Sequence, residues 1–417
     1  MNILVLNCGS SSIKYQVIDM NEASHKLLAK GLVDRIGQAE GDLKHKPVGK
    51  EPLELHQPIA DHNVGIDLIL KALIDPAHGV INSYDEIKAV GHRVAHGGEH
   101  FNGSALVTPE AIEKVRDCIK MAPLHNPANL QGALSMAEIL PNVPQVFTFD
   151  TAFHQTIPAH NYLYAIPYKY YTEEKIRKYG FHGTSHKFVA KVAADMVGLD
   201  VEKSRIVTCH IGNGASITAV KFGKSFNTTM GFTPADGLCM GTRSGQIDPC
   251  ALIHIARNEN MSYDEMDAFI NKKSGIQGLT GISSDMRDID AAYEAGVKIA
   301  IEGRDLYYNR VKSYVGAYAA EMGGLDLVVF TGGVGENSDD LREYVCKDME
   351  FLGLEFDYEA NKGVRGESKV LSKPNSRVKA VVAETNEELV IASDTDAIVK
   401  NLEKTIQLWK LDIWKMS

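Results

Sequence analysis

The alternation of apolar and polar positions is the same in two distant segments of the chain. Residues 3–19 and residues 206–218 each contain an apolar run, a short turn of glycine and small polar residues, and a second apolar run. Such runs predict β-strands joined by a tight turn. Backbone N–H groups and short hydroxyls in a turn of this kind are free to face an anion. The repeat therefore predicts two related domains that close on one polyphosphate.

Apolar spacing elsewhere predicts strands and helices in alternation. A third strand is expected after the first hairpin at 26–33, and the second hairpin is expected to cover 205–229. Further strands are expected over 87–95, 143–150, 325–330 and 378–382. Helices are expected over 64–73, 109–121, 129–140, 187–197, 249–257, 262–272, 289–296, 298–322 and 387–402. Residues 40–62, 153–179 and 231–245 lack a clear period and are expected to be irregular.

Antiparallel hairpins followed by β-α alternation, found twice, predict an α/β fold of two duplicated domains with a cleft between them. The length of 417 residues agrees, because one hydrophobic core rarely serves so long a chain. The last helix is expected to return to the first domain. The predicted domains are therefore residues 1–152 plus 388–417, and residues 153–387.

Composition narrows the class of protein. Apolar residues make up 44% and charged residues 24% of the chain, as in soluble globular enzymes. The net charge of −10 argues against a nucleic-acid partner, because the chain lacks a basic stripe that could replace counterions. Six scattered cysteines without metal-ligand or redox spacing predict reduced thiols. The absence of a signal-peptide pattern and of a long apolar segment predicts a cytoplasmic location without a membrane partner.

The phosphate-binding pattern is not one of the common ones. Neither a Walker A sequence nor a GxGxxG run after the first strand occurs. The candidates are the two hairpin turns and the segment 330–337, where an apolar strand leads through glycines into a helix. A single glycine-rich turn is more often a plain hairpin. Three such turns in one chain, each after an apolar strand, favour phosphate binding.

Four charged or titratable residues lie beside glycines and other small residues: Arg93, Asp150, His182 and Arg243. Each taken singly is as well explained by a surface ion pair or a core histidine. Glycine at these positions, however, lets a ligand approach the chain closely and does nothing for an exposed helix. The four residues are therefore candidates for one site.

With these residues, the chain resembles the acetate kinases, which belong to the superfamily of acetate and sugar kinases, heat-shock ATPases and actin. The resemblance covers nearly the whole length. Its motifs are Asn7-Cys8-Gly9-Ser10-Ser11-Ser12 with Lys14, Gly91-His92-Arg93, Asp150-Thr151-Ala152-Phe153-His154, Gly180-Phe181-His182-Gly183-Thr184-Ser185-His186, His210-Ile211-Gly212-Asn213-Gly214, Gly241-Thr242-Arg243-Ser244-Gly245 and Thr331-Gly332-Gly333-Val334-Gly335-Glu336-Asn337.

The resemblance implies a function. Acetate kinases transfer the terminal phosphoryl group of ATP to acetate, reversibly, which yields ADP and acetyl phosphate. It also implies a duplicated ribonuclease-H-like (actin-like ATPase) fold, Mg²⁺ as the cofactor with Mn²⁺ as an alternative, and a homodimer.

The resemblance assigns roles to particular residues. The catalytic residues it implies are Arg93, Asp150, His182 and Arg243. The substrate-binding residues are Arg93, Ala95, Leu124, Phe181 and Pro234, and the magnesium-associated residues are Asn7 and Glu387. The nucleotide-binding residues are Lys14, His210, Ile211, Gly212, Asn213, Gly214, Asp285, Met286, Arg287, Gly333, Val334, Gly335, Glu336 and Asn337.

The role of Asp150 departs from the family's assignment on physical grounds. The family assigns it as proton donor and acceptor. A carboxylic acid substrate is already ionised at neutral pH and needs no base. We therefore expect Asp150 to hold metal-bound water or to orient an arginine.

Two residues depart from the family pattern. Ala95 stands where many acetate kinases have valine, which widens the expected slot for the acid's methyl group and predicts activity on propionate as well. Gln246 stands where the family commonly has aspartate, three residues after Arg243.

The alternatives to an acetate kinase are a propionate kinase with acetate as secondary substrate, a non-catalytic nucleotide switch and a pyrophosphate-dependent variant. The cluster of four residues disfavours the switch. Gly333 and Asn337, at the family's adenosine pocket, disfavour the pyrophosphate variant.

Overall fold

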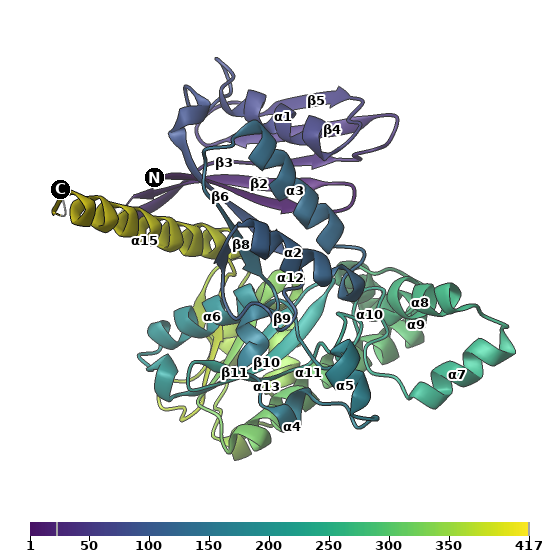
Figure 1. The fold of residues 1–417 in the computed structure, drawn as a ribbon. Coiled ribbons are helices and arrows are strands. Elements are labelled where there is room, and N and C mark those ends of the chain that lie inside the picture. Colours follow the sequence, from purple (N-terminus) through teal and green to yellow (C-terminus); the bar gives the residue numbers. More distant parts are fainter. Residues whose placement is uncertain (22–23, 416–417) are drawn as a thin grey trace. The chain divides into compact units, whose positions relative to one another are not determined.

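The chain forms two compact units, each built on one β-sheet. The structure, a computed structural model, describes residues 1–21 and 24–415, and the side chains of these residues except 24, 403 and 405–415. Unit 1 comprises Met1–Ala152 and Asn386–Ser417, and unit 2 comprises Phe153–Thr385. Figure 1 shows the chain coloured from the N-terminus to the C-terminus.

The sheet of unit 1 has the strand order β5-β4-β3-β2-β1-β6-β8-β7. Strands β1 to β5 pair in antiparallel fashion, whereas β6 is parallel to β1 and β8 is parallel to β6. The carboxyl ends of β1, β6 and β8 therefore meet at one edge of the sheet. The strands are β1 Asn2–Cys8, β2 Ile13–Asn21, β3 Ser24–Asp34, β4 Gly41–Pro47, β5 Leu53–Gln57, β6 Ile87–Val94, β7 Ala105–Leu106 and β8 Gln145–Phe149.

Helices cover both faces of this sheet. Alternate residues of a strand point to opposite faces. Leu4 and Leu6 of β1 belong to one apolar cluster with α1 (His62–Leu73) and α3 (Asn126–Ile139), whereas Ile3 and Val5 pack with α15 (Glu387–Lys415). The first part of helix α15 packs on its face of the sheet, with its principal contacts on β6, β1 and β2, and Figure 1 shows the rest of the helix extending beyond the strands. The remaining helical segments of unit 1 are α2 Pro109–Asp117 and the 3₁₀ turns Tyr84–Glu86 and Ile119–Met121.

Unit 2 repeats the central topology of unit 1. Its strand order is β11-β10-β9-β12-β14-β13, with β9 to β11 antiparallel and β12 and β14 parallel to β9. The first five positions match β3-β2-β1-β6-β8 of unit 1, so the predicted duplication of an α/β domain is confirmed. The strands are β9 Arg205–Ile211, β10 Ala215–Lys221, β11 Lys224–Thr228, β12 Leu327–Thr331, β13 Lys369–Val370 and β14 Lys379–Val382.

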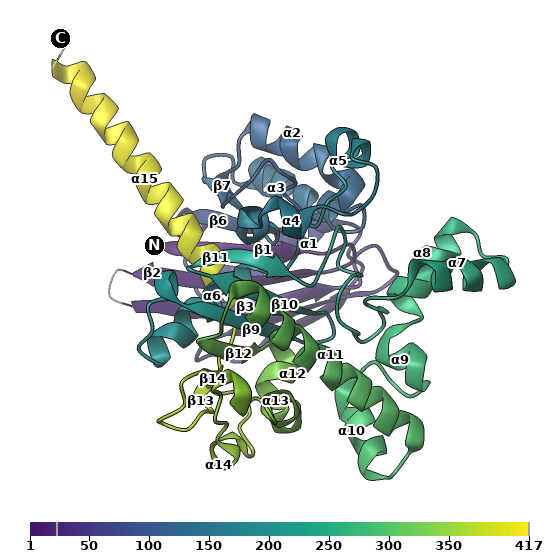
Figure 2. The ribbon, with the colours of Figure 1, turned by 90° about the horizontal axis from the view of Figure 1, so that it is seen from below.

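The two faces of the second sheet carry α6 (Gly183–Met196) and α11 (Lys298–Met322). Helix α6 shares an apolar cluster with Ile206 of β9, and α11 shares another with Val207 of the same strand. Figure 2 shows α11 running beside β10 and β9. The other helices are α4 Ala159–Tyr162, α5 Lys169–Glu174, α7 Pro249–Asn258, α8 Tyr263–Lys272, α9 Gly275–Thr280, α10 Met286–Glu294, α12 Gly332–Asn337, α13 Asp339–Cys346 and α14 Tyr358–Asn361, with 3₁₀ turns at Ala152–Thr156, Val201–Lys203 and Glu350–Leu352.

The expectation of an irregular segment over residues 40–62 is wrong, because β4 and β5 lie there. In β4, a polar residue at an inward position hides the strand pattern. His45 of β4 is fully buried, where an apolar residue would be expected. Its ring nitrogens are 2.6 Å from the Tyr15 hydroxyl and 3.1 Å from the His78 carbonyl oxygen. A polar side chain can occupy a core position when each of its polar atoms has a hydrogen-bond partner.

The last helix is longer than expected, since α15 ends at Lys415 and not at Leu402. The predicted helix over 298–322 agrees with α11 in both bounds, and the loop over 231–245 contains no helix or strand. Within the described residues, no helix combines the length and the apolar character that crossing a membrane would require.

Candidate active site

The site residues of unit 1 gather where β1, β6 and β8 end. Arg93 lies near the end of β6, Asp150 follows β8, and Asn7 is the penultimate residue of β1. Arg93 Nε donates to Asp150 Oδ1 at 2.9 Å and Arg93 Nη2 to Asp150 Oδ2 at 2.5 Å. Arg93 Nη1 also donates to Asn7 Oδ1 at 3.2 Å. The side chain of Asp150 is 5% exposed and that of Arg93 24%, so the carboxylate is buried and part of the Arg93 side chain reaches solvent.

Helix α3 holds the ends of these strands in place. Asn129 donates to the Cys8 carbonyl oxygen at 2.6 Å and accepts from the Ala95 N–H at 3.0 Å. Asn126 exchanges two hydrogen bonds with the backbone of His96. Both asparagines are buried, so these contacts are protected from water. They tie the segments that follow β1 and β6 to one rigid helix.

Glu387 joins this cluster from the first residue of α15. Burial raises the pKa of its carboxyl to about 7, and the carboxylates of Asp150 and Glu388 add to the rise. The positive charges of Arg93 and Lys14 act in the opposite direction. A carboxylate at neutral pH in such surroundings is stabilised by any further cation.

The chemistry of these donors fits a divalent metal that is bound together with phosphate. Within the described parts of the chain, no group of three or more His, Cys, Asp or Glu side chains is placed to hold an ion. Mg²⁺ needs no such group, because it is commonly bound by one or two carboxylates with substrate phosphates and water. The amide oxygen of Asn7 and the carboxylate of Glu387 are oxygen donors of the kind that this ion prefers.

Three further predicted residues belong to unit 1. Lys14 of β2 lies opposite Asn7 in the strand register and is exposed. Lys14 therefore belongs to the same unit as Arg93 and Asp150, whereas the other predicted nucleotide-binding residues belong to unit 2. Ala95 is buried, with 4% of its surface exposed, whereas Leu124 is 64% exposed.

In unit 2, His182 lies immediately before α6 in a strained conformation. Its φ of 56° is in the left-handed region, which residues other than glycine rarely adopt. Its ring stacks on that of His210, with 4.2 Å between the centroids. A conformation of this kind persists only where the surrounding structure holds the residue in place.

Arg243 and His182 meet at the turn between β9 and β10. A Cβ built on Gly214 would lie 3.6 Å from Arg243 Nη1 and 3.7 Å from the His182 ring. Both distances are ordinary van der Waals contacts, so the two side chains lie directly beside this turn. The loop that carries Arg243 rests on the same turn, because the Gly241 N–H donates to the Asn213 carbonyl oxygen at 3.0 Å. Burial lowers the pKa of Arg243.

Other predicted nucleotide-binding segments lie beside this turn. A Cβ on Gly212 would be 3.8 Å from the Gly333 nitrogen, and a Cβ on Gly241 would be 3.3 Å from the Ser284 Cβ. The segments 212–214, 333–337 and 285–287 thus come together around the turn. The side chains of Ile211 and Met286 belong to the core cluster, so only their backbone is available to a ligand.

Several other predicted groups of unit 2 already have partners within the chain. Glu336 Oε1 accepts hydrogen bonds from Thr331 Oγ1 at 3.0 Å, from the Gly332 N–H at 2.9 Å and from the Thr385 N–H at 3.1 Å. The Asp285 carboxylate pairs with the Arg287 guanidinium, and these hydrogen bonds lower the pKa of Asp285 to about 2. The Asn337 amide donates to the Gly333 carbonyl oxygen.

Two predicted substrate-binding residues also belong to unit 2. Phe181 is buried and Pro234 is half-buried.

Sequence reasoning missed the residues that support His182. Ser216 Oγ lies 2.9 Å from His182 Nδ1 and 2.7 Å from His186 Nε2. Ser185 Oγ lies 2.8 Å from His210 Nδ1 and 2.8 Å from Thr385 Oγ1. His186 and Ser185 lie in the run that follows His182, which was the one available signal.

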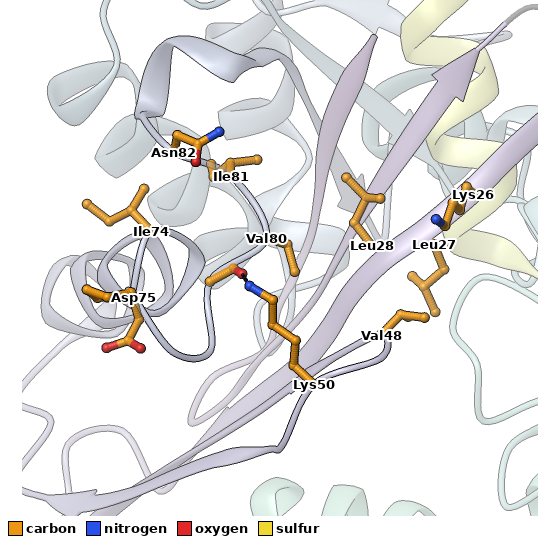
Figure 3. Close-up of a pocket in the computed structure, with 12 residues that line it drawn as sticks. Lys26, Leu27, Leu28, Val48, Lys50, Ile74, Asp75, Val80, Ile81 and Asn82 are labelled. Carbon is orange, nitrogen blue, oxygen red and sulfur yellow. Dashed lines mark hydrogen bonds between the residues drawn. The ribbon is translucent and has the colours of Figure 1, made fainter.

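A cavity of about 400 Å³ in unit 1 is not part of this site. Figure 3 shows its lining, which comes from β3, the turn before β5 and the segment after α1. Lys50 donates across it to the Gly79 carbonyl oxygen at 2.5 Å. None of the residues predicted from the sequence lines it.

Comparison with known proteins identifies the family. The model of the Acetokinase family matches residues 2–393. The chain belongs to the acetokinase family. It is 53% identical to acetate kinase 2 of Clostridium perfringens, over 96% of this chain and all of that one.

Solved structures agree with the family assignment. The crystal structure of Porphyromonas gingivalis acetate kinase matches with a TM-score of 0.92 and 49% identity, over 95% of this chain and 99% of that one. A propionate kinase from Francisella tularensis matches with a TM-score of 0.86 and 38% identity, over the same shares.

Family membership makes the chain a kinase with the actin-like ATPase fold, as the sequence predicts. It also implies ATP or ADP as a substrate and a divalent metal as cofactor.

Proposed function

We propose that the chain is an acetate kinase, which transfers the terminal phosphoryl group of ATP to acetate and runs the reverse reaction from acetyl phosphate and ADP. The observation that carries the proposal is the fixed pair of Arg93 and Asp150. A guanidinium held by two bonds on one edge keeps its remaining N–H groups in a set direction. Such a planar fork suits a small carboxylate.

The roles of the other residues follow from the nature of phosphoryl transfer. The transition state is loose and metaphosphate-like, so catalysis consists mainly of positioning and charge stabilisation. Arg93 binds the carboxylate of the acceptor. Arg243 and His182, which converge on Gly214, bind the oxygens of the transferred group. Asp150 orients Arg93 and transfers no proton.

The metal is proposed to be Mg²⁺, held by Asn7 and Glu387 together with phosphate oxygens. When bound, it neutralises charge on the phosphates. The predicted segments around Gly212–Gly214 bind the nucleotide through backbone groups, since several of their side chains already have partners in the chain. A homodimer remains a prediction from the resemblance, and a cytoplasmic location remains a prediction from the absence of a signal-peptide pattern.

Propionate is the second candidate acceptor, because Ala95 leaves room for another methylene. A methylene group in an apolar pocket contributes about 1–3 kcal/mol to binding. The difference of two methyl groups between alanine and valine at residue 95 is therefore enough to alter the preference between acetate and propionate. The likeness to a propionate kinase at 38% identity supports this alternative less strongly than the acetate kinases at about 50% support acetate.

A coupled assay with acetate, propionate and butyrate at saturating ATP tests the proposal. Acetate is expected to give the highest kcat/KM, with propionate within about tenfold and butyrate lower. Hydroxylamine trapping of the acyl phosphate confirms the product. Absence of acyl hydroxamate with all three acids would overturn the proposal, and a higher kcat/KM for propionate would replace acetate as the principal substrate.

A further inference from the structure

The charged side chain of Arg304 lies inside unit 2, on helix α11, and only 11% of it is exposed. Its Nη2 donates to Asp340 Oδ2 of α13 at 3.0 Å, and its Nε lies 3.6 Å from Asp290 Oδ1 of α10. Its Cζ also lies 3.9 Å from the centroid of the Tyr293 ring of α10, at the distance of a cation–π contact. One side chain of α11 thus contacts two neighbouring helices.

Both of these helices follow segments that are predicted to bind the nucleotide. The segment 285–287 forms the start of α10, and Asp290 lies in the turn that comes next. The segment 333–337 ends just before the cap of α13, and Asp340 is the second residue of that helix. Arg304 therefore links the two predicted segments through the helices that continue from them.

The next turn of α11 adds a contact at the start of α13. Tyr308 is four residues after Arg304, so the two side chains share one face of the helix. The guanidinium lies 5.0 Å from the centroid of the Tyr308 ring, and the Tyr308 hydroxyl is 3.3 Å from Ser338 Oγ. Ser338 caps α13, since its Oγ accepts from the Leu341 N–H at 3.2 Å. The face of α11 that carries Arg304 thus also holds the first turn of α13.

The directional part of this helix packing comes from the guanidinium. Ile289 of α10 and Leu341 of α13 belong to the same core cluster as Val311 of α11. Apolar attraction is non-directional, so it draws the helices together without aligning particular residues. A guanidinium is planar and presents its N–H groups in fixed directions. The contacts of Arg304 therefore set which parts of α10 and α13 lie next to each other.

Stability alone gives little reason for a charge at this position. An apolar side chain of similar volume in place of a buried ion pair is often neutral or stabilising. The Asp340 side chain is 61% exposed, and exposed ion pairs contribute little to stability. A role in placing the helices explains the charge better than a role in stabilising them.

We propose that Arg304 is a positioning residue for the nucleotide. It joins α10 to α13 and thereby holds the segments 285–287 and 333–337 at the spacing in which they bind adenosine. The inference rests on the proposed function, which assigns these segments to the nucleotide. Segments that are held in their binding conformation bind more tightly, because less ordering accompanies the binding step.

The first test measures the binding of Mg²⁺–ADP by calorimetry. Arg304→Met removes the charge but keeps a long unbranched side chain, and it is expected to raise the Kd for ADP by about tenfold. Arg304→Lys keeps the charge without the planar fork and is expected to recover only part of this loss. Lys298→Met removes a cation from an exposed position of the same helix and should leave the Kd unchanged. An unchanged Kd in Arg304→Met would overturn the proposal.

Asp340→Asn tests the same link without disturbing the buried guanidinium. Because Asp340 is mostly exposed, this variant is expected to fold, and its Kd for ADP should rise by about threefold. The double variant with Arg304→Met should bind ADP as weakly as Arg304→Met alone, since both changes break one contact. Additive losses in the double variant would show that the two residues act separately and would overturn the proposal.

Hydrogen exchange in the ligand-free protein tests the positioning itself. Backbone amides at the start of α10 and of α13 are expected to exchange faster in Arg304→Met than in the wild-type protein. Amides in the sheet of unit 1 should exchange at unchanged rates. Equal exchange at the start of both helices would overturn the proposal, and this result depends on neither ATP nor acetate.

Kinetics then separate positioning from a loss of folded protein. Arg304→Met is expected to raise KM for ATP by about tenfold and to leave KM for acetate unchanged. A loss of folded protein would instead lower kcat and leave both KM values as they are. If acetate is not phosphorylated but Arg304→Met weakens ADP binding, the proposed function fails and the role of Arg304 stands. If acetate is phosphorylated and Arg304→Met binds ADP normally, the proposed function stands and the inference fails.

Discussion

The guanidinium of Arg93 and the carboxylate of Asp150 form a two-point ion pair, with N–O distances of 2.9 and 2.5 Å. Both oxygens of Asp150 are engaged by Arg93. A carboxylate in this position orients a guanidinium by its geometry and its charge. The relationship agrees with a positioning role for Asp150 and with the absence of a need for a base when the acceptor is already ionised.

Replacement of Asp150 by asparagine distinguishes a positioning role from a proton-transfer role. Asp150→Asn keeps one oxygen acceptor but removes the charge that fixes Arg93, so kcat/KM for acetate should fall by about 10²-fold. The loss should be uniform between pH 6 and pH 9, measured by the coupled assay. Asp117→Asn, at an exposed position of α2, should leave activity unchanged. Recovery of Asp150→Asn activity as the pH rises would instead support a proton-transfer role.

Arg243→Ala should lower kcat by about 10³-fold or more, because a guanidinium aimed at a transferring phosphoryl group stabilises charge that exists only in the transition state. The measurement is steady-state kinetics at saturating ATP and acetate. Arg257→Ala, an exposed change on α7, is the matched control. A loss of only about tenfold, expressed in KM, would limit Arg243 to ground-state binding.

Ala95→Val should sharpen the preference for acetate. The added methyl groups occupy the space that a propionate methylene needs, so the ratio of kcat/KM for acetate to that for propionate should rise by about tenfold or more. Substrate profiles of wild type and variant give this ratio directly. The surface change Ala77→Val should leave it unaltered. An unchanged ratio in Ala95→Val would remove residue 95 from the acyl pocket.

Most of the fold could be predicted because its signals are local. The strands of both hairpins and helix α11 follow from apolar spacing within their own segments. Strand β4 could not be found, since its core residue His45 is polar and has its hydrogen-bond partners at Tyr15 and His78, which are distant in sequence. The short helix α9 escaped notice because six residues give too little periodicity.

The candidate site likewise contains residues that could be predicted from the sequence and residues that could not. Residues flanked by glycine, such as Arg93 and His182, could be selected from the sequence because glycine marks close approach. Ser216 carries no such mark. Its position against His182 and His186 depends on the register of β9 with β10 and on the packing of α6, which are relationships between distant segments.

Glu336 offers a test of a residue that the sequence assigns to nucleotide binding. Its Oε1 accepts three hydrogen bonds within unit 2, so Glu336→Ala should lower the free energy of unfolding by about 2–4 kcal/mol. Glu336→Gln keeps the acceptor and should leave KM for ATP unchanged. Urea unfolding and ATP titration supply the two readouts, with the exposed change Glu343→Ala as control. A large rise in KM for ATP in Glu336→Gln, at unchanged stability, would show that the carboxylate contacts the nucleotide.

The buried histidines predict a loss of stability in acid. Burial lowers the pKa of His92 and of His154 to about 4, against an unfolded value of 6.5. The folded protein therefore keeps these rings neutral while the unfolded chain takes up protons below pH 6.5, so stability is full above pH 6.5 and falls as the pH decreases towards 4.

Each of these rings contributes on the order of 3 kcal/mol to that loss, because one unit of pKa corresponds to about 1.4 kcal/mol. Urea unfolding between pH 7.5 and pH 4.5 measures the slope. His92→Gln, which preserves a polar contact to Gln145, should reduce the proton uptake on unfolding relative to wild type. His56→Gln is the control, because the His56 side chain is 70% exposed. An acid slope equal to that of wild type in His92→Gln would mean that His92 is protonated in the folded protein, contrary to its burial.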